Sequence, residues 1–251
     1  MSLKVTTRVQ TKARDKNQRT VWETVESEER LDPAQTALLL CDVWDNHWCR
    51  GAVERLETMV PRMNQIVEAT RRAGIVIIHA PSGTLDTYEE TPARRRILEA
   101  PRATPVELEH EDPPLPIDAS DHGSDTGETE THQPWASQHA GIRVDQDRDV
   151  ISDDGREIYS FFTARGIRTM LILGVHTNMC VLHRTFGIKQ MVRWGIRPLL
   201  IRDLTDTMYN PAMPPYVSHE EGTDLVVGYI EKFWCPTTTS RAILDAAASA
   251  A

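Results

Sequence analysis

Four short, mainly apolar runs divide the chain. Each run has the length of a β-strand, and a run without alternating polar positions is typical of a strand buried on both faces. These predicted core strands are residues 36–44, 75–80, 169–175 and 197–203.

Between the strands, apolar residues recur with the period of an α-helix. The clearest case runs from Val53 to Arg72 and stops at Gly74. Shorter helices are expected over 91–99, 154–165 and 219–233. Strands that alternate with helices predict an α/β fold. We expect a three-layer α/β/α sandwich around a mostly parallel, five- to six-stranded Rossmann-like sheet.

The two ends of the chain differ from this core pattern. Residues 4–30 alternate polar and β-branched residues around a turn at 15–18, which predicts an exposed β-hairpin within an N-terminal extension, 1–32. The main domain is expected over 33–240, with an edge strand at 236–240 and a C-terminal tail at 241–251.

A long acidic segment interrupts the domain. Residues 101–131 are rich in proline and carry nine carboxylates against one cation, Arg102. So many charges cannot lie in a core, so we expect a long loop or lid that extends over 101–147. A neighbouring subunit could order it.

Composition narrows the class of protein. The chain has 251 residues, enough for one sizeable domain, and its net charge of −9 argues against nucleic-acid binding. Its apolar runs are too short to cross a membrane, and the first residues lack the apolar core of a signal peptide. The four cysteines have neither metal-finger nor disulfide spacing, so a reduced, cytoplasmic protein is expected.

Cys180 follows the apolar run 169–175 and is expected to open a helix that runs to about Trp194. A thiol at the carboxyl end of a parallel strand lies where such sheets bind ligands. At a helix N-terminus its pKa would be lowered and the sulfur would become nucleophilic. The alternative is that Cys180 is a small buried hydrophobic residue.

Asp42 provides a second candidate, because the apolar run 36–44 contains this carboxylate near its end. A charge at the end of a core strand is costly unless it is paired or functional. Asp42 and Cys180 are therefore a candidate carboxylate–thiol pair.

Two motifs resemble the isochorismatase-like cysteine hydrolase superfamily, which includes nicotinamidases, N-carbamoyl amide hydrolases and isochorismatase. They are Gly174-Val-His-Thr-Asn-Met-Cys180-Val and, more loosely, Leu-Leu-Leu-Cys-Asp42-Val-Trp-Asp-Asn. The resemblance covers about 35–235. It implies that Cys180 is the nucleophile and Asp42 the acid/base. It also implies a cis Val175–His176 bond, with the His176 and Cys180 N–H groups forming an oxyanion hole, and an assembly of identical subunits.

The family's catalytic lysine is missing, since no lysine lies between Lys16 and Lys189. Arg148 could supply the cation, although a guanidinium cannot shuttle protons. A histidine among His47, His79 and His176 could take over part of the acid/base work. The third alternative is that the thiol chemistry has been lost.

Several residues follow the predicted strands and are candidates to line a substrate pocket. They are Trp44, His47, Trp48, His79, His183 and Tyr209. Nicotinamidases carry an Asp/His metal site, but its histidine spacing is absent here, so neither a metal nor another cofactor is expected.

Our leading hypothesis is a hydrolase that cleaves a C–N bond of a small amide, imide or carbamoyl compound through a cysteine thioester. One alternative is isochorismatase-type ether hydrolysis, which would use Asp42 without the thiol. Another is a catalytically silent homologue that binds a small molecule.

Overall fold

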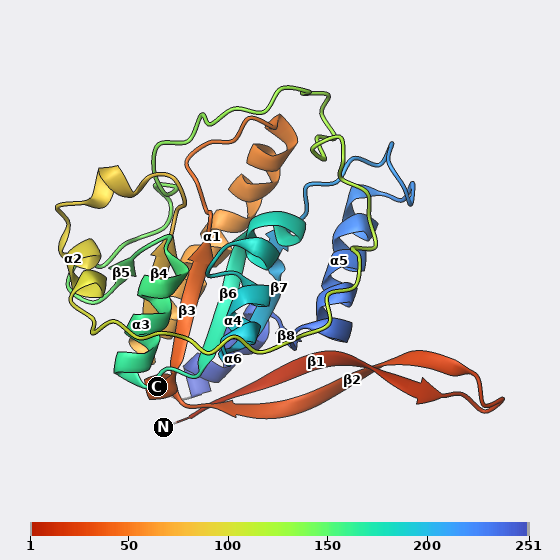
Figure 1. Ribbon diagram of the computed structural model, residues 1–251, viewed down its shortest axis with the longest axis horizontal. Helices are drawn as coiled ribbons and strands as arrows, with labels where there is room; N and C mark the ends of the chain where they lie inside the picture. Colours follow the sequence, from red (N-terminus) through yellow and green to blue (C-terminus); the bar gives the residue numbers. More distant parts are fainter. Residues whose placement is uncertain (1, 250–251) are drawn as a thin grey trace.

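A single eight-stranded sheet runs through the computed structural model, which describes residues 2–249 (Figure 1). The strand order is β2-β1-β8-β7-β6-β3-β4-β5. From β8 to β5 neighbouring strands are parallel, and the β1–β2 hairpin adds two antiparallel strands. The strands are β1 (Leu3–Arg14), β2 (Thr20–Leu31), β3 (Thr36–Cys41), β4 (Val76–Ala80), β5 (Val150–Ile151), β6 (Thr169–Val175), β7 (Arg197–Asp206) and β8 (Thr237–Thr238).

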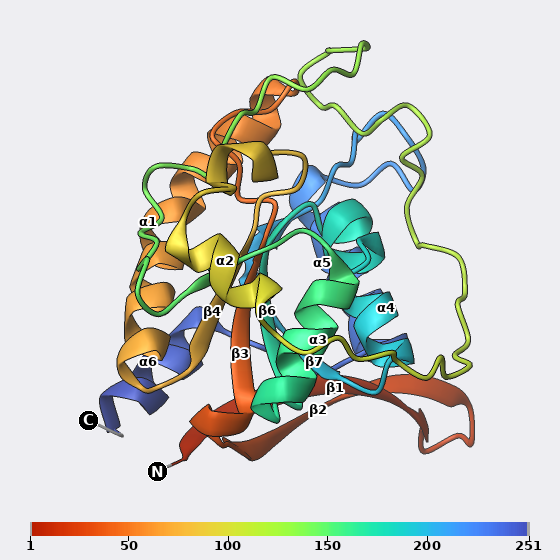
Figure 2. The same cartoon turned by 60° about the vertical axis from the view of Figure 1, so that its left-hand side comes forward.

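Helices cover both faces of this sheet. Figure 2 shows α1 and α6 on one side and α3, α4 and α5 on the other. The helices are α1 (Arg50–Arg72), α2 (Pro92–Leu98), α3 (Gly155–Arg165), α4 (Ile188–Arg193), α5 (His219–Phe233) and α6 (Ser240–Ser249), with 3₁₀ turns η1 (Pro33–Gln35) and η2 (Leu85–Tyr88) and the π-turn η3 (Thr177–Val181). The predicted α/β/α sandwich is confirmed, and six parallel strands form its centre.

Two separate hydrophobic clusters explain why the core strands are apolar throughout. Leu38 and Leu40 pack toward α1 and α6, whereas Leu39 and Cys41 pack toward α3, α4 and α5. Successive side chains of a strand point to opposite faces. Both faces are covered, so a polar residue at any of these positions would be buried.

The predicted hairpin is present and joins the sheet through β8. Arg8 of β1 pairs with Thr237, and β7 flanks β8 on its other side. The prediction of an edge strand at 236–240 is therefore wrong, because the hairpin covers that edge. β2 takes the edge position instead, and most of its residues are exposed.

Two further boundaries differ from the pattern. Residues 240–249, within and just before the expected tail, form α6, whose Ile243 and Ala246 are buried against the core. The helix expected from Cys180 to Trp194 is interrupted before Gly187. A Cβ atom at Gly187 would lie 2.9–3.0 Å from backbone atoms of Val181 and Arg184, so the chain turns closely there.

The acidic segment is ordered along the outside of the domain (Figure 1). It contains neither helix nor strand before β5, as expected, although an isolated bridge joins Gln138 to Trp44. Its carboxylates pair with cations of the domain, among them Asp112 with Lys189 and Asp125 with Arg55. The charges that exclude this segment from a core thus attach it to the surface.

Gly174 allows β3 and β6 to approach each other closely where Cys41 lies opposite Gly174. Its φ is +119°, and a Cβ atom there would lie 2.0 Å from the Cys41 carbonyl oxygen. We expect Gly174→Ala to destabilise the protein by more than about 4 kcal/mol, because the two strands would have to separate. Gly195→Ala is the matched control: its φ is +77°, but no atom lies within 4 Å of the added carbon. It should cost only about 1–2 kcal/mol. Equal losses in urea unfolding would contradict this account.

Candidate active site

Asp42 and Cys180 both lie just beyond the carboxyl ends of two central strands of the sheet, β3 and β6. β3 and β6 are neighbours, with Cys41 opposite Gly174, so both chains leave the sheet side by side. The Asp42 carboxylate is fully buried and accepts two hydrogen bonds. Oδ1 accepts from the Ser82 N–H at 2.9 Å, and Oδ2 accepts from Arg184 Nε at 2.9 Å. Its negative charge lies close enough to the Cys180 thiol to raise the pKa of that thiol.

Cys180 sits in the π-turn η3 directly after β6. The Val175–His176 peptide bond is cis, and the His176 N–H lies close enough to the Cys180 sulfur to lower the pKa of the thiol. The His176 carbonyl accepts from the N–H groups of Met179 and Val181 at 3.1 Å each. These contacts place the thiol and one backbone donor next to each other.

The thiol is not activated in the manner expected from sequence. Burial, followed by the negative charge of Asp42, raises the pKa of Cys180 to about 12, although Arg184 and the His176 N–H act in the opposite direction. Only one turn follows the cysteine before the helix is interrupted, so the effect of a long helix dipole is missing. At neutral pH the resting sulfur is therefore a protonated thiol beside a carboxylate.

We expect Asp42→Asn to increase the rate of alkylation at Cys180 by at least about tenfold at pH 8. The substitution removes the charge that raises the thiol pKa and keeps Arg184, which lowers it. The rate of iodoacetamide labelling, read by peptide mass spectrometry, measures the effect. The buried Cys235 of the same molecule is the internal control. An unchanged or slower rate at Cys180 would contradict this electrostatic description.

Arg184 supplies the cation beside Asp42 and was not among the candidates from sequence. Its side chain is 38% exposed. Burial of Asp42 raises the pKa of that carboxyl, and the charge of Arg184 opposes this increase. Arg184 follows Cys180 by four residues, a spacing that brings side chains to one face of a helical turn. That spacing was the available signal. Arg148, proposed from sequence, has a 69% exposed side chain that pairs with Asp145.

A cluster of aromatic rings extends from Arg184 to His176. The Arg184 guanidinium lies 5.9 Å from the centre of the Trp44 ring, and Trp44 stacks on Trp135 at 4.2 Å. His47 stacks on Trp135 and contacts both Trp48 and the edge of the His176 ring. Trp135 comes from the acidic segment and had no local sequence signal.

The histidines of this cluster are neutral at physiological pH. Burial lowers the pKa of His47 to about 4 and that of His176 to about 3. Neither therefore supplies a positive charge beside the thiol.

Two of the predicted pocket residues, His79 and Tyr209, are buried and hydrogen-bonded within the protein, and a third, His183, is exposed. His79 is fully buried, and its ring nitrogens bond to Gln138 and Asp149. Tyr209 is fully buried and donates its hydroxyl to the Met213 carbonyl. His183 is exposed next to the site, one residue before Arg184.

Residues 2–249 contain no group of three or more His, Cys, Asp or Glu side chains arranged to hold a metal ion. No helix in this part of the chain has the length and apolar character needed to span a membrane.

Comparison with known proteins identifies the fold. No protein-family profile and no curated protein matches the chain. Among solved structures, a cysteine hydrolase from Pseudomonas syringae pv. phaseolicola 1448A has a TM-score of 0.55 at 16% identity, covering 88% of this chain and 96% of its own. A putative isochorismatase from Burkholderia xenovorans LB400 has a TM-score of 0.52 at 15% identity, covering 86% and 88%. An isochorismatase from Pseudomonas putida KT2440 has a TM-score of 0.51 at 10% identity, covering 83% and 89%. The chain thus has the fold of the isochorismatase-like hydrolases.

Proposed function

We propose that this protein hydrolyses a C–N bond of a small amide, imide or carbamoyl compound through a thioester on Cys180. The observation that carries the proposal is the buried Asp42 carboxylate, which bonds to the Arg184 guanidinium at 2.9 Å and whose charge acts on the neighbouring Cys180 thiol. A protonated thiol next to a buried base is a nucleophile that becomes active as its proton leaves.

The first half of the reaction forms the thioester. Asp42 takes the thiol proton while the sulfur bonds to the substrate carbonyl carbon. The oxyanion that forms would accept hydrogen bonds from the His176 and Cys180 N–H groups. Donors of this kind typically contribute about 3–4 kcal/mol to transition-state stabilisation. The protonated Asp42 then gives its proton to the nitrogen as the C–N bond breaks and the amine leaves.

The second half resolves the thioester. Water attacks the acyl carbon, and Asp42 accepts a proton from it. The C–S bond breaks, and the proton returns to sulfur as the acid product departs. Asp42 carries out every proton transfer, because a guanidinium does not release its proton in this range.

Arg184 has an electrostatic role in this scheme. Burial raises the pKa of Asp42, and the charge of Arg184 is the strongest opposing influence. Arg184 thereby keeps a buried carboxylate available as a base. When the proton has moved from sulfur to Asp42, the positive charge of Arg184 stabilises the Cys180 thiolate. In the next step it stabilises the negative charge on the substrate oxygen.

The aromatic cluster favours a small substrate with a flat face. Stacking against the partly exposed indole rings of Trp48 or Trp135 would bury such a face and exclude water. An amide, imide or carbamoyl group is planar. The names of the structural neighbours, a cysteine hydrolase and two isochorismatases, are compatible with a hydrolase but do not distinguish C–N from ether cleavage.

A substrate screen tests the proposal directly. The purified protein is incubated with a panel of small amides, imides and carbamoyl compounds, and release of ammonia or amine is measured. Intact-mass spectrometry of quenched reactions should detect an acyl adduct on Cys180. Turnover of an enol ether with no adduct would favour the isochorismatase-type reaction. Binding of these compounds without turnover would favour a silent homologue.

We also propose that the protein acts as a homo-oligomer in the cytoplasm. The exposed edge strand β2 and the outer acidic segment offer contact surfaces. Within residues 2–249 the four cysteines form no disulfide, which fits a reducing compartment. Light scattering on the purified protein measures the mass of the assembly.

A further inference from the structure

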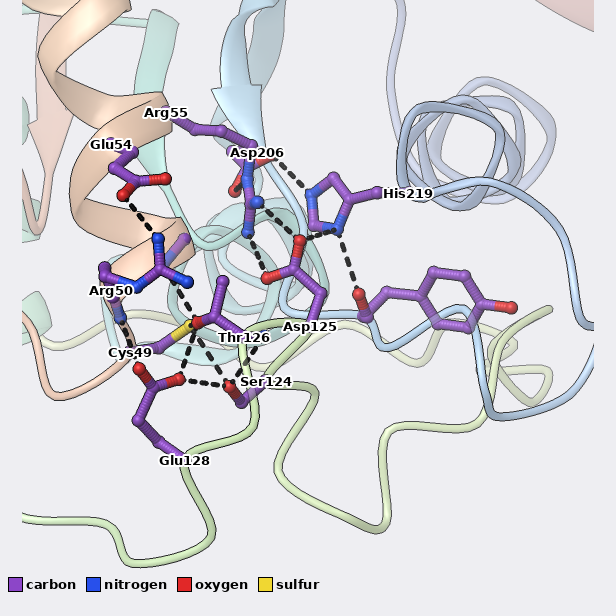
Figure 3. Close-up of polar contacts among 12 residues, drawn as sticks. Cys49, Arg50, Glu54, Arg55, Ser124, Asp125, Thr126, Glu128, Asp206 and His219 are labelled. Carbon is purple, nitrogen blue, oxygen red and sulfur yellow. Dashed lines mark hydrogen bonds and ion pairs between the residues drawn. The ribbon is translucent and has the colours of Figure 1, made fainter.

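A charged cluster lies where four elements meet (Figure 3). Asp206 ends β7, Arg55 comes from α1, Asp125 from the acidic segment, and His219 begins α5. Arg55 donates to Asp206 at 2.9 Å and to both oxygens of Asp125 at 2.7 and 3.2 Å. The proposed mechanism uses none of these side chains.

His219 is bonded at both ring nitrogens to groups that only accept hydrogen bonds. Nε2 lies 2.9 Å from Asp206 Oδ1, and Nδ1 lies 2.9 Å from the Tyr209 carbonyl oxygen. A neutral imidazole has one N–H, so it can satisfy only one of them. The geometry therefore requires the imidazolium, with two N–H groups, in a side chain that is only 7% exposed.

His219 bonds to both ends of segment 206–209. This segment contacts β6 and the π-turn η3, which carries Cys180. Asp206 pairs in register with Val175, the residue before the cis bond. Met208 exchanges two hydrogen bonds with the Asn178 side chain: its N–H donates at 3.0 Å, and its carbonyl accepts at 2.9 Å. Asn178 belongs to the π-turn that carries Cys180.

We infer that His219 is a positioning residue for the proposed reaction: its imidazolium clamps segment 206–209, and that segment aligns the turn bearing Cys180 and the His176 amide. The inference rests on the proposed function for its catalytic consequence, although the clamp itself can be measured without a substrate.

The charges around His219 favour its protonated form. Burial alone would lower its pKa, but the hydrogen bond to Asp206 and the charge of that carboxylate outweigh burial, so the pKa is raised above its ordinary value. Asp125 lies 3.7 Å from Nδ1. The charge of Arg55 and the positive end of the α5 dipole lower the pKa of His219. Glu220 and Glu221 partly offset that helix end, and the neighbouring His176 is neutral.

The sign of the pH dependence follows. A histidine whose folded pKa is raised contributes its full stabilisation below the unfolded pKa of about 6.5 and loses it as pH rises through the folded value. Above that value one N–H is lost, an acceptor faces another acceptor, and the clamp opens. We expect rising pH to loosen the turn before it ionises the Cys180 thiol, whose pKa is about 12.

The first test uses the wild-type protein without substrate. Histidine-labelled protein followed by NMR should show His219 with both N–H groups at pH 7 and titrating above about 6.5. Hydrogen exchange of residues 174–181, corrected for intrinsic rates, should lose at least about tenfold in protection through the same pH range. A His219 that titrates at or below 6.5, or protection that does not follow its ionisation, overturns the inference.

The second test uses the substrate found by screening. His219→Gln should lower kcat about 10–100-fold with KM changed less than about threefold, because misalignment affects the transition state. It should also remove the alkaline limb of the kcat profile that reports this group. Asp206→Asn should move that limb to lower pH. His122→Asn, at an exposed histidine of the acidic segment, is the control and should keep it.

The two proposals fail separately. If no compound is hydrolysed, the proposed function is wrong, and the NMR and exchange measurements still decide whether the clamp exists. If hydrolysis depends on Cys180 but His219→Gln retains the wild-type kcat and alkaline limb, only the clamp is wrong. If His219→Gln does not fold, the wild-type titration and Asp206→Asn decide the outcome.

Discussion

Replacing Cys180 with alanine is expected to reduce kcat/KM for C–N hydrolysis by at least about 10³-fold, since the variant has no atom that can form the thioester. The fold should be retained, because the side chain is partly exposed and lies at the sheet edge rather than within it. Initial rates of ammonia release, with circular dichroism of both proteins, provide the measurement.

Cys235→Ala is the matched control for this loss. Cys235 is also a free thiol, but it is buried in the hydrophobic cluster next to α5 and does not contact Asp42. Its replacement should leave the rate within about threefold of wild type. Full activity of Cys180→Ala on the true substrate would eliminate the thioester mechanism. In that case, the ether-hydrolysis alternative would remain, because it uses Asp42 alone.

Replacing Arg184 with alanine is expected to shift the acid limb of kcat/KM to higher pH and to destabilise the fold. The guanidinium lowers the pKa of Asp42, whose burial already raises it above 3.8. Without the cation, the carboxylate ionises only at higher pH, and less base is present below that point. A buried charge that loses its partner costs about 3–5 kcal/mol. Because Arg184 is 38% exposed and water can replace part of it, we expect about 1–3 kcal/mol.

The measurements are a pH–rate profile and a thermal melt. The Tm should fall by about 3–10 °C. Arg184→Lys keeps the charge and should restore most of the acid limb, which a purely structural role would not require. Arg148→Ala is the control, since that exposed arginine pairs with Asp145. An acid limb that stays in place in Arg184→Ala would contradict the proposed role of the guanidinium.

The layered fold could be predicted because each element carries its own periodic signal. The run 169–175 matches β6 at both ends, and the helix over 219–233 matches α5. Burial on both faces forces an uninterrupted apolar run, and burial on one face forces a helical period. Short elements were less accessible: β8 has two residues, and its neighbours decide whether it lies at an edge.

The candidate site was only partly predictable. Asp42 and Cys180 each follow a recognisable strand, so their meeting required only that β3 and β6 be neighbours. Arg184 was overlooked although its spacing from Cys180 was visible, because an arginine on a helix is usually solvated. Trp135 lies 91 positions from Trp44, and no pattern in the intervening sequence predicts that the two rings stack.

The sequence by itself determined the central strands and the longer helices, and which two side chains stand at the strand ends, because these follow from local patterns of burial. The ionisation of those side chains was decided by the tertiary structure. The same thiol that a helix N-terminus would acidify has its pKa raised to about 12 when it is buried beside a carboxylate. Desolvation and charge depend on everything within a few ångströms, and most of those neighbours come from distant parts of the chain.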